Sequence, residues 1–507
     1  MKTFYTLLVI SVCLINPLFS QIYVATDGND SNNGTLEQPY KTIPKAISMA
    51  QAGDKIYLRG GTYALSTTIT ISSSKSGTEN SRYYLWAYPG ERPLLDFSTT
   101  QFGDRGIQLE ASYWYFQGFD VKGAGDNGLY ISGGSNNIIE FCTFYENRDT
   151  GLQLASGAAD NQIINCDSYY NADPPDYGDA DGFAPKLTVG SGNYFYGCRA
   201  WGNCDDGWDG YMRGATDVTT TLDHCWTWGN GYLKDGTDPG SQANGNGFKM
   251  GGGDNSNSAK LMHHHVLKNC MAFSNKAKGF DQNNNVGSMT LLNCTGYANG
   301  SANYRIQKSL NSGQTLTVTN SVSYNGSVEL GSFAVQQTNS WMTPFNVSAA
   351  DFVSLDPETA LAPRQEDGSL PEIELLHLAQ GSDLIDGGTD IGLPFQGAAP
   401  DLGAFETGII ASIPSIEITQ PDFTLFQNFP NPFNPATTIK YRLHKPAAVM
   451  LKIYNIAGQE VATLADASQN PGEYAVKWQP SGLSNGIYFY QLRAGNFCKT
   501  MKLILQK

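Results

Sequence analysis

The chain has 507 residues, of which 40% are hydrophobic and 16% charged, and it carries a formal net charge of −15 at pH 7. This length points to two or three domains, and the 55 glycines indicate many turns, as in turn-rich β proteins. The negative charge argues against nucleic acid or an anionic membrane as a partner, because both are bound by clustered lysine and arginine side chains.

Residues 1–20 are predicted to be a secretory signal peptide. Lys2 gives a positive start, residues 4–18 are mostly apolar, and the small Ser20 occupies a suitable cleavage position. A buried first strand is the alternative. No later segment contains the roughly 20 consecutive apolar residues that a transmembrane helix needs. We therefore expect an exported, monomeric protein without a membrane span.

Residues 22–64 are predicted to open the mature chain with a strand, a turn-rich loop and a short helix near residues 43–52. Thr42 is the predicted N-cap of this helix and Gly53 the residue that stops it. A strand at residues 55–58 then begins an all-β pattern.

An internal repeat organises the next part of the chain. Six cysteines, at intervals of 24, 32, 27, 45 and 24 residues, are each followed five residues later by asparagine: Cys142/Asn147, Cys166/Asn171, Cys198/Asn203, Cys225/Asn230, Cys270/Asn275 and Cys294/Asn299. Such repetition predicts a stack of small buried side chains and a ladder of asparagines that bond one another at a bend; a disulfide framework is the alternative. A 24-residue strand-turn repeat predicts a solenoid of parallel strands, a β-helix.

A second repeated position follows each asparagine bend and consists of a glycine, an apolar residue and a variable residue. If the apolar side chain points inward, the next one points outward, and stacked strands lie about 4.8 Å apart. The triplets are Gly128-Leu129-Tyr130, Gly151-Leu152-Gln153, Gly182-Phe183-Ala184, Gly207-Trp208-Asp209, Gly247-Phe248-Lys249 and Gly279-Phe280-Asp281, with Asn303-Tyr304-Arg305 one coil later. The sequence therefore predicts an outward column of Asp209, Lys249, Asp281 and Arg305.

Four carboxylates are predicted to converge on one patch. Asp181 and Asp206 precede the repeat glycine on adjacent coils, Asp205 precedes Asp206, and Asp209 lies in the outward column. Unpaired carboxylates repel one another, and a hard divalent cation such as Ca²⁺, which prefers oxygen ligands, removes that repulsion. We therefore predict that these four aspartates bind Ca²⁺; a solvated acidic face is the alternative.

Lys249, one coil beyond Asp209, is the predicted catalytic base. A neighbouring cation would favour the neutral form of this lysine, and a neutral amine can accept a proton. The arrangement suits removal of a proton α to a carboxylate, after which a C4 ether oxygen leaves by β-elimination. An ordinary surface charge is the alternative.

Several long blocks resemble the family 9 polysaccharide lyases, which are pectate lyases with a right-handed parallel β-helix. They are "DADGFAPKLTVGSGNYFYGCRAWGNCDDGWDGYM", "GNGFKMGG" and "HHHVLKNCMAFSNKAKGFDQNNN". The resemblance covers about residues 22–405 and implies a catalytic domain at 21–405. It also implies that Ca²⁺ is bound by the same four aspartates and that Lys249 is the base. The family includes rhamnogalacturonan lyases, so the exact pectin backbone stays open.

An acidic enzyme can bind an anionic cell-wall polysaccharide such as polygalacturonate if its cleft is locally positive. Ca²⁺, Lys249 and Arg305 would supply that charge, and Arg305 suits a bidentate contact with a substrate carboxylate, or it flanks the site. Asp281 is the other candidate for substrate binding, and we expect it to be an orienting partner or a plain turn residue rather than a catalyst. Residues 263–265 are three histidines, but adjacent strand residues point to opposite faces, which argues against zinc. Trp208 is predicted to lie in the core.

The chain changes character after residue 405. Residues 406–423 are a predicted linker, and residues 424–507 contain about seven short strands with turn signals between them. The segments "FQNFPNPFNPAT", "YNIAGQEV" and "GIYFYQL" resemble the C-terminal sorting domain of type IX secretion. This implies a small β-sandwich recognised by the secretion machinery, and a protein that is secreted or attached to the outer surface. A carbohydrate-binding module is the alternative.

Two other functions remain open for the whole chain. A polygalacturonase-like hydrolase would use paired carboxylates as acid and base, would need no aligned lysine and would work in the presence of a chelator. A non-catalytic adhesin would use the long face of the solenoid for binding.

Overall fold

We describe a computed structural model of the chain. It covers residues 20–408, except 215–216 and 254–257, and residues 423–506, except 426–427, 429, 444–445, 456–458, 471, 481 and 495–496. The predicted signal peptide up to residue 19 and the predicted linker at 409–422 lie outside the described residues. Contacts divide the chain into two units, residues 1–409 and 410–507, and each is described by itself.

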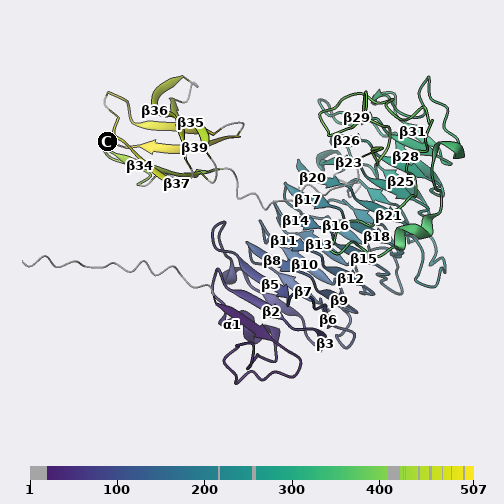
Figure 1. The fold of residues 1–507 in the computed structure, drawn as a ribbon, viewed down its shortest axis with the longest axis horizontal. Coiled ribbons are helices and arrows are strands. Elements are labelled where there is room, and N and C mark those ends of the chain that lie inside the picture. Colours follow the sequence, from purple (N-terminus) through teal and green to yellow (C-terminus); the bar gives the residue numbers. More distant parts are fainter. Residues whose placement is uncertain are drawn as a thin grey trace, which may run out of the picture. The chain divides into compact units, whose positions relative to one another are not determined.

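The first unit is a parallel β-helix whose three sheets are built from strands that take turns along the chain (Figure 1). The first sheet has twelve strands: β1 (Gln21–Val24), β2 (Lys55–Leu58), β5 (Tyr83–Ala87), β8 (Trp114–Gln117), β11 (Ile138–Glu140), β14 (Gln162–Ile164), β17 (Asn193–Tyr196), β20 (Val218–Asp223), β23 (His263–Lys268), β26 (Met289–Leu292), β29 (Leu316–Thr319) and β32 (Val335–Gln337). The predicted all-β solenoid is confirmed.

The second sheet contains the predicted outward column and has ten strands: β4 (Ile69–Ile71), β7 (Ile107–Leu109), β10 (Leu129–Ser132), β13 (Leu152–Ala155), β16 (Phe183–Pro185), β19 (Trp208–Asp209), β22 (Phe248–Lys249), β25 (Lys278–Asp281), β28 (Ala302–Ile306) and β31 (Val328–Leu330). The third sheet also has ten: β3 (Gly61–Ala64), β6 (Pro93–Asp96), β9 (Asp120–Lys122), β12 (Thr143–Tyr145), β15 (Asp167–Tyr169), β18 (Arg199–Trp201), β21 (Trp226–Trp228), β24 (Met271–Phe273), β27 (Thr295–Tyr297) and β30 (Val322–Tyr324).

Short helices complete the unit: α1 (Ile43–Met49) and the 3₁₀ turns η1 (Ser73–Lys75), η2 (Ser258–Lys260), η3 (Ala349–Asp351) and η4 (Pro357–Leu361). The predicted cap of α1 is confirmed, because the Thr42 side chain accepts a hydrogen bond from the backbone of Lys45. The predicted end of this helix is wrong by three residues. Ala50 is already extended, so the chain leaves the helix before Gly53, which adopts a positive φ of 104°.

The predicted asparagine ladder is confirmed. The ladder consists of Asn147, Asn171, Asn203, Asn230, Asn275, Asn299 and Asn303. From Asn171 on, the Oδ1 of each accepts hydrogen bonds from both the backbone N–H and the side-chain amide of the asparagine before it in this series. The six repeat cysteines are buried free thiols, so the disulfide alternative is wrong for them. The side chain of Cys498 lies outside the described residues.

Substitution of Asn275 tests what the ladder contributes to stability. Its Oδ1 accepts bonds from Asn230 N at 3.2 Å and Asn230 Nδ2 at 2.8 Å. Asn275→Ala leaves these buried donors without their acceptor, and we expect the free energy of unfolding to fall by about 2–3 kcal/mol. Chemical denaturation followed by circular dichroism measures the change. The exposed Asn33→Ala is the control and should shift the free energy by less than about 0.5 kcal/mol.

Close stacking of the coils explains the repeated glycines. A Cβ added to Gly207 would lie 2.0 Å from Thr227 Oγ1 and 2.7 Å from Gly247 O on the next coil. The residue that follows each of these glycines is buried, and the Trp208 ring stacks between Phe183 and Phe248 with centroids at 4.8 and 5.1 Å. The prediction that Trp208 belongs to the core is confirmed.

The chain beyond the last coil packs on the third sheet. Apolar residues of this segment, including Phe352 and Leu375, join Trp226 and Phe273 in one buried cluster. Arg364 and Arg199 both form ion pairs with the buried Asp167, with nitrogen–oxygen distances of 2.6 and 2.8 Å. This segment therefore covers a different face from the one that carries the predicted site.

The second unit consists of two antiparallel sheets. One contains β33 (Phe423–Leu425), β34 (Thr437–Leu443) and β37 (Gly472–Trp478); the other contains β36 (Glu460–Gln469), β35 (Ala447–Asn455), β38 (Gly486–Ala494) and β39 (Phe497–Leu505). Residues from both sheets, such as Ile439 and Leu451, share one hydrophobic core, as in a sandwich. The seven strands match the number predicted. Among the described residues of the chain, no helix is both long and apolar enough to cross a membrane.

Candidate active site

The second sheet aligns the predicted column in register. Asp209 pairs with Lys249, Lys249 with Asp281, and Asp281 with Arg305 on successive strands β19, β22, β25 and β28. The prediction that these four residues stack on consecutive coils is confirmed. The register follows from the buried apolar residue that precedes each of them, because a shift by one residue would turn that side chain outward.

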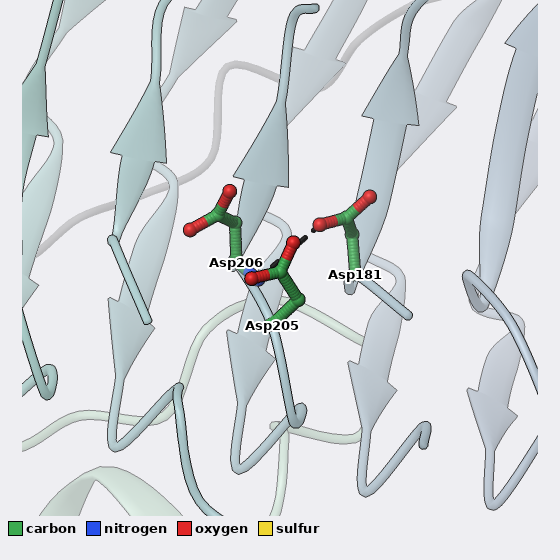
Figure 2. Close-up of side chains that lie close together, drawn as sticks. All are labelled: Asp181, Asp205 and Asp206. Carbon is green, nitrogen blue, oxygen red and sulfur yellow. Dashed lines mark hydrogen bonds between the residues drawn. The ribbon is translucent and has the colours of Figure 1, made fainter. Parts of the chain in front are cut away.

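Asp181, Asp205 and Asp206 form a buried acidic triad (Figure 2). One carboxylate oxygen from each lies within 4.8 Å of one from each of the others. Asp181 lies directly before Gly182, and Asp206 directly before Gly207, so both carboxylates leave the chain at the same point of adjacent coils. The backbone N–H of Asp206 donates to Asp181 Oδ1 at 3.2 Å, which links the two coils at the triad.

Two asparagines hold the other members of the triad, and the sequence analysis did not identify them. Asn244 Nδ2 donates to Asp205 Oδ1 at 3.0 Å, and the Asn244 backbone bonds the same oxygen. Asn246 donates its backbone N–H and Nδ2 to Asp206 Oδ1 at 2.7 and 2.8 Å. Asn244 ends the loop of residues 234–244 that precedes the next coil, so this insertion positions the acidic residues.

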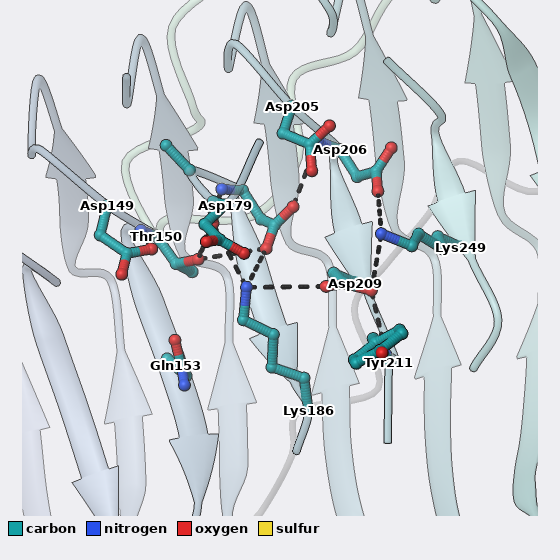
Figure 3. A network of polar contacts seen from close by, with 12 residues as sticks. Asp149, Thr150, Gln153, Asp179, Lys186, Asp205, Asp206, Asp209, Tyr211 and Lys249 are labelled. Carbon is teal, nitrogen blue, oxygen red and sulfur yellow. Dashed lines mark hydrogen bonds and ion pairs between the residues drawn. The ribbon is translucent and has the colours of Figure 1, made fainter. Parts of the chain in front are cut away.

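Lys249 lies against the triad from the next coil (Figure 3). Its Nζ is 2.9 Å from Asp206 Oδ2 and 3.3 Å from Asp209 Oδ1. Asp209 is outside the triad as defined by the 4.8 Å limit, and its Oδ1 also accepts a bond from Tyr211 N at 3.0 Å. The structure thus brings together the five residues predicted for the metal and the base, and Lys249 contacts both the triad member Asp206 and Asp209.

Lys186 is a second buried lysine in this network, and the sequence analysis missed it. Its Nζ lies 2.7 Å from Asp181 Oδ2 and 3.6 Å from Asp209 Oδ2, and it donates to Asp179 O at 3.2 Å (Figure 3). The strand alternation contains the signal that would have found it. Phe183 points inward and Ala184 outward, so Lys186, two residues after Ala184, points to the same side as Ala184.

Burial dominates the electrostatics of the triad. Burial raises the pKa of Asp181 well above its usual value, although the nearby Lys186 ammonium lowers it. Burial also raises the pKa of Asp205 well above its usual value, and the negative charge of the neighbouring Asp206 raises it further. Burial alone would lower the pKa of Lys249, but Asp206 and Asp209 outweigh it and raise that pKa well above its usual value. The protein's own charges therefore favour protons, or another cation, among these groups.

The donor set fits a hard divalent cation. All members of the triad offer carboxylate oxygens, which Ca²⁺ prefers. Asp206 Oδ2 is buried, and the Lys249 ammonium lies 2.9 Å from it. With Asp209 included, four carboxylates face the two ammonium groups of Lys186 and Lys249, and the negative charge that is left suits a divalent cation.

Comparison with known proteins places this geometry in a family. Residues 22–325 match the model described as "Pel9A-like, right handed beta helix region". The chain belongs to the Pel9A-like family. The predicted family resemblance and the right-handed β-helix are thereby confirmed.

Relatives of the Pel9A-like chain cover most of its length. Pectate lyase L of Dickeya chrysanthemi is 41% identical over 396 residues, which are 76% of this chain and 90% of the relative. Pectate lyase L of Paenibacillus polymyxa (strain SC2) is 43% identical over 398 residues, 73% of this chain and 84% of the relative. The crystal structure of pectate lyase Pel9A superposes with a TM-score of 0.70 at 39% identity, covering 76% of this chain and 96% of that one.

Two further matches bear on function. A rhamnogalacturonan lyase structure superposes with a TM-score of 0.63 at 26% identity and covers 72% of this chain and 98% of that one. Residues 427–506 match the model "Secretion system C-terminal sorting domain". The second unit therefore carries a sorting domain, which confirms that part of the resemblance and indicates export by type IX secretion.

Arg305 and Asp281 occupy the column of the Pel9A-like chain beyond Lys249, but both are paired. Arg305 donates through Nε and Nη2 to the two oxygens of Glu329 at 2.7 and 2.8 Å. Asp281 Oδ2 lies 3.1 Å from Lys278 Nζ. The predicted bidentate arginine geometry exists, although its partner here is a carboxylate of the protein.

The three histidines alternate between faces, as predicted. His263 and His265 are buried, whereas His264 points outward and lies 2.7 Å from Asp217 Oδ1 through Nε2. His263 lies 2.7 Å from Thr220 Oγ1 and 2.9 Å from Gly210 O, and burial lowers its pKa to about 4. The three rings therefore do not converge on one point.

Proposed function

We propose that the protein is a secreted, calcium-dependent pectate lyase that cleaves polygalacturonate by β-elimination, with Lys249 as the base. One observation carries this proposal. The Lys249 amine lies within 3.3 Å of both Asp206 and Asp209 on the adjacent coil, beside a buried triad of carboxylates. The identity of 41–43% to proteins named pectate lyase L supports it.

Asp181, Asp205 and Asp206 would hold the calcium ion, with Asp209 as the fourth ligand. The close approach of the buried carboxylate oxygens of the triad, beside Lys186 and Lys249, supports this assignment. When bound, calcium would neutralise these carboxylates, attract the carboxylate of the substrate and make the proton α to it more acidic. Asn244 and Asn246 keep two of the ligands oriented while the metal binds.

Lys249 would take the proton from C5 of the uronate, the carbon next to the carboxylate. The electron pair of the broken C–H bond forms the C4–C5 double bond, the C4–O bond breaks, and its electron pair leaves with the oxygen of the departing sugar. Lys249 must be neutral to act, and its carboxylate neighbours favour its charged form. Activity is therefore expected to rise with pH through the neutral and alkaline range.

Polygalacturonate is the favoured substrate over rhamnogalacturonan. The pectate lyase relatives are 39–43% identical to this chain, whereas the rhamnogalacturonan lyase is 26% identical. The Lys249–Asp209 arrangement argues against a hydrolase with paired carboxylates as acid and base, and against an adhesin, neither of which needs it.

The predicted domain plan completes the proposal. Residues 1–20 would direct export, residues 21–405 would form the catalytic domain, and residues 406–423 would link it to the sorting sandwich at 424–507. We expect the enzyme to be monomeric and to be released or held at the outer surface after type IX secretion.

Ultraviolet absorbance tests this function directly. Polygalacturonate incubated with the enzyme at mildly alkaline pH is expected to gain absorbance in calcium, because the C4–C5 double bond is conjugated with the carboxylate, and excess chelator is expected to stop the gain. New reducing ends without absorbance would instead mean hydrolysis and would remove Lys249 from its role. Unsaturated product from rhamnogalacturonan alone would mean that rhamnogalacturonan is the substrate, and the β-elimination mechanism would stand.

A further inference from the structure

A groove leads away from Lys249 in one direction along the second sheet. It encloses about 360 Å³ and is lined from Arg105 through Tyr130 and Lys186 to Lys249. No described residue beyond Lys249 in the sequence lines it. From the coil of Lys249 to the coil of Arg105 there are five steps between stacked strands, or about 24 Å at about 4.8 Å each. The groove is thus longer than a single sugar ring.

The opposite direction along the sheet is occupied by ion pairs within the protein. Asp281 is paired with Lys278, and Arg305 with both oxygens of Glu329. A substrate carboxylate that bound Arg305 would have to displace Glu329. Both Arg305 guanidinium nitrogens that could form a bidentate contact with a substrate carboxylate, Nε and Nη2, already donate to Glu329.

Arg105 is placed to receive a carboxylate at the far end of the groove. It lies two residues before a strand of the second sheet, as Asp181 and Asp206 do, and three coils before Asp181. Its guanidinium carbon lies 3.6 Å from the ring centroid of Tyr130, so the arginine packs on that ring, and Nη1 donates to Gln108 Oε1 at 2.9 Å. Its Nε forms an ion pair with Asp126 Oδ2 at 3.7 Å, which is too long for a hydrogen bond, so the Nε–H donates to no acceptor within the described residues.

One acidic residue of the groove, Asp149, opposes an anionic ligand less than a fully charged carboxylate would. Burial raises the pKa of Asp149 to about 7. The Lys186 ammonium lowers this pKa and the Asp126 carboxylate raises it, and the carboxyl is therefore only partly charged at neutral pH. Arg213 adds a further cation to the lining, and carboxylates can also accept hydrogen bonds from sugar hydroxyls.

We propose that this groove binds the part of the uronate chain that runs from the reacting sugar toward the N-terminal coils, and that Arg105 binds one of its carboxylates. The inference rests on the proposed function, because it takes a galacturonate polymer as the ligand. It places long-chain recognition at Arg105, about five coils from the base, and excludes Arg305 from that role.

Chain length separates this role from a structural one. Arg105→Gln is expected to raise KM for long polygalacturonate about tenfold, the scale of one charge-assisted hydrogen bond, with little change in kcat. KM for trigalacturonate should change less than twofold, since a trimer at Lys249 does not reach Arg105. Lys41→Gln, which removes a charge from an exposed residue outside the groove, is the control and should change neither KM.

Three kinetic results would overturn the groove proposal. They are an equal rise in KM for polymer and trimer, an unchanged KM for both, and a larger rise for the polymer in Arg305→Gln than in Arg105→Gln. Binding is measured separately, as retardation of the full-length protein in native gels that contain polygalacturonate. If the wild type is retarded, Arg105→Gln is not, and no unsaturated product forms, β-elimination is rejected and the groove proposal stands. If the wild type is not retarded, the groove proposal is rejected.

Discussion

Lys249→Ala is expected to lower the turnover of polygalacturonate by about 10²–10⁴-fold, the range contributed by a general base. The variant removes the only group proposed to accept the C5 proton and leaves Asp206, Asp209 and the triad in place. The rate of absorbance gain in calcium measures the loss, and the circular dichroism spectrum shows whether the β-helix is kept. The side chain lies at the edge of the groove and its truncation leaves the apolar core intact.

Lys249→Arg distinguishes a base from a fixed positive charge. Arginine can keep ion pairs with Asp206 and Asp209, but it cannot lose its proton in a protein. We therefore expect this variant to be as inactive as Lys249→Ala. Recovery of more than a tenth of wild-type turnover in Lys249→Arg would mean that the residue acts through its charge, and the proposed mechanism would be wrong.

The repeat made the fold and most of the candidate site predictable. Each coil meets the same local demands, namely a small buried side chain, an asparagine at the bend and a glycine where the next coil approaches. Cys198, Asn203 and Gly207 satisfy these demands within ten residues, so the positions of Asp206 and Asp209 follow from strand alternation alone. Lys249 could be aligned across a 45-residue interval because Gly247 and Phe248 repeat the same pattern.

A second asparagine ladder was missed although its signal is in the sequence. Asn137, Asn161 and Asn193 bond one another on successive coils at the start of strands of the first sheet. Each lies five residues before a repeat cysteine, at the same intervals of 24 and 32 residues. These asparagines precede the cysteines, whereas the predicted ladder is formed by the asparagines that follow them.

Other contacts depend on loops whose lengths break the repeat. Asn244 reaches Asp205 from an insertion of the 45-residue interval, and the sequence does not fix how that loop returns to the sheet. The pairing of Arg305 with Glu329 depends on strand β31, whose Val328-Glu329-Leu330 lacks the preceding glycine of the earlier coils. The predicted substrate contact of Arg305 therefore rested on position alone, without knowledge of its partner.

Asp206→Asn is expected to weaken calcium binding by more than about 100-fold. Loss of residues that only support metal ligands already lowers affinity 10–100-fold, and Asp206 is proposed as a ligand itself. The amide keeps the volume of the side chain but replaces one oxygen with NH₂, which donates hydrogen bonds and cannot bind a cation. Isothermal titration of the full-length protein with calcium measures the affinity.

Asp281→Asn provides the matched control, because it changes another buried aspartate of the second sheet two coils from Asp209. Its calcium affinity should stay within about twofold of wild type, since its carboxylate faces Lys278. Ligand binding to the folded state raises the melting temperature, so calcium should stabilise wild type and Asp281→Asn but not Asp206→Asn. Equal stabilisation of all three proteins would mean that calcium binds outside the triad. The proposed reason why Lys249 can act as a base beside these carboxylates would then be wrong.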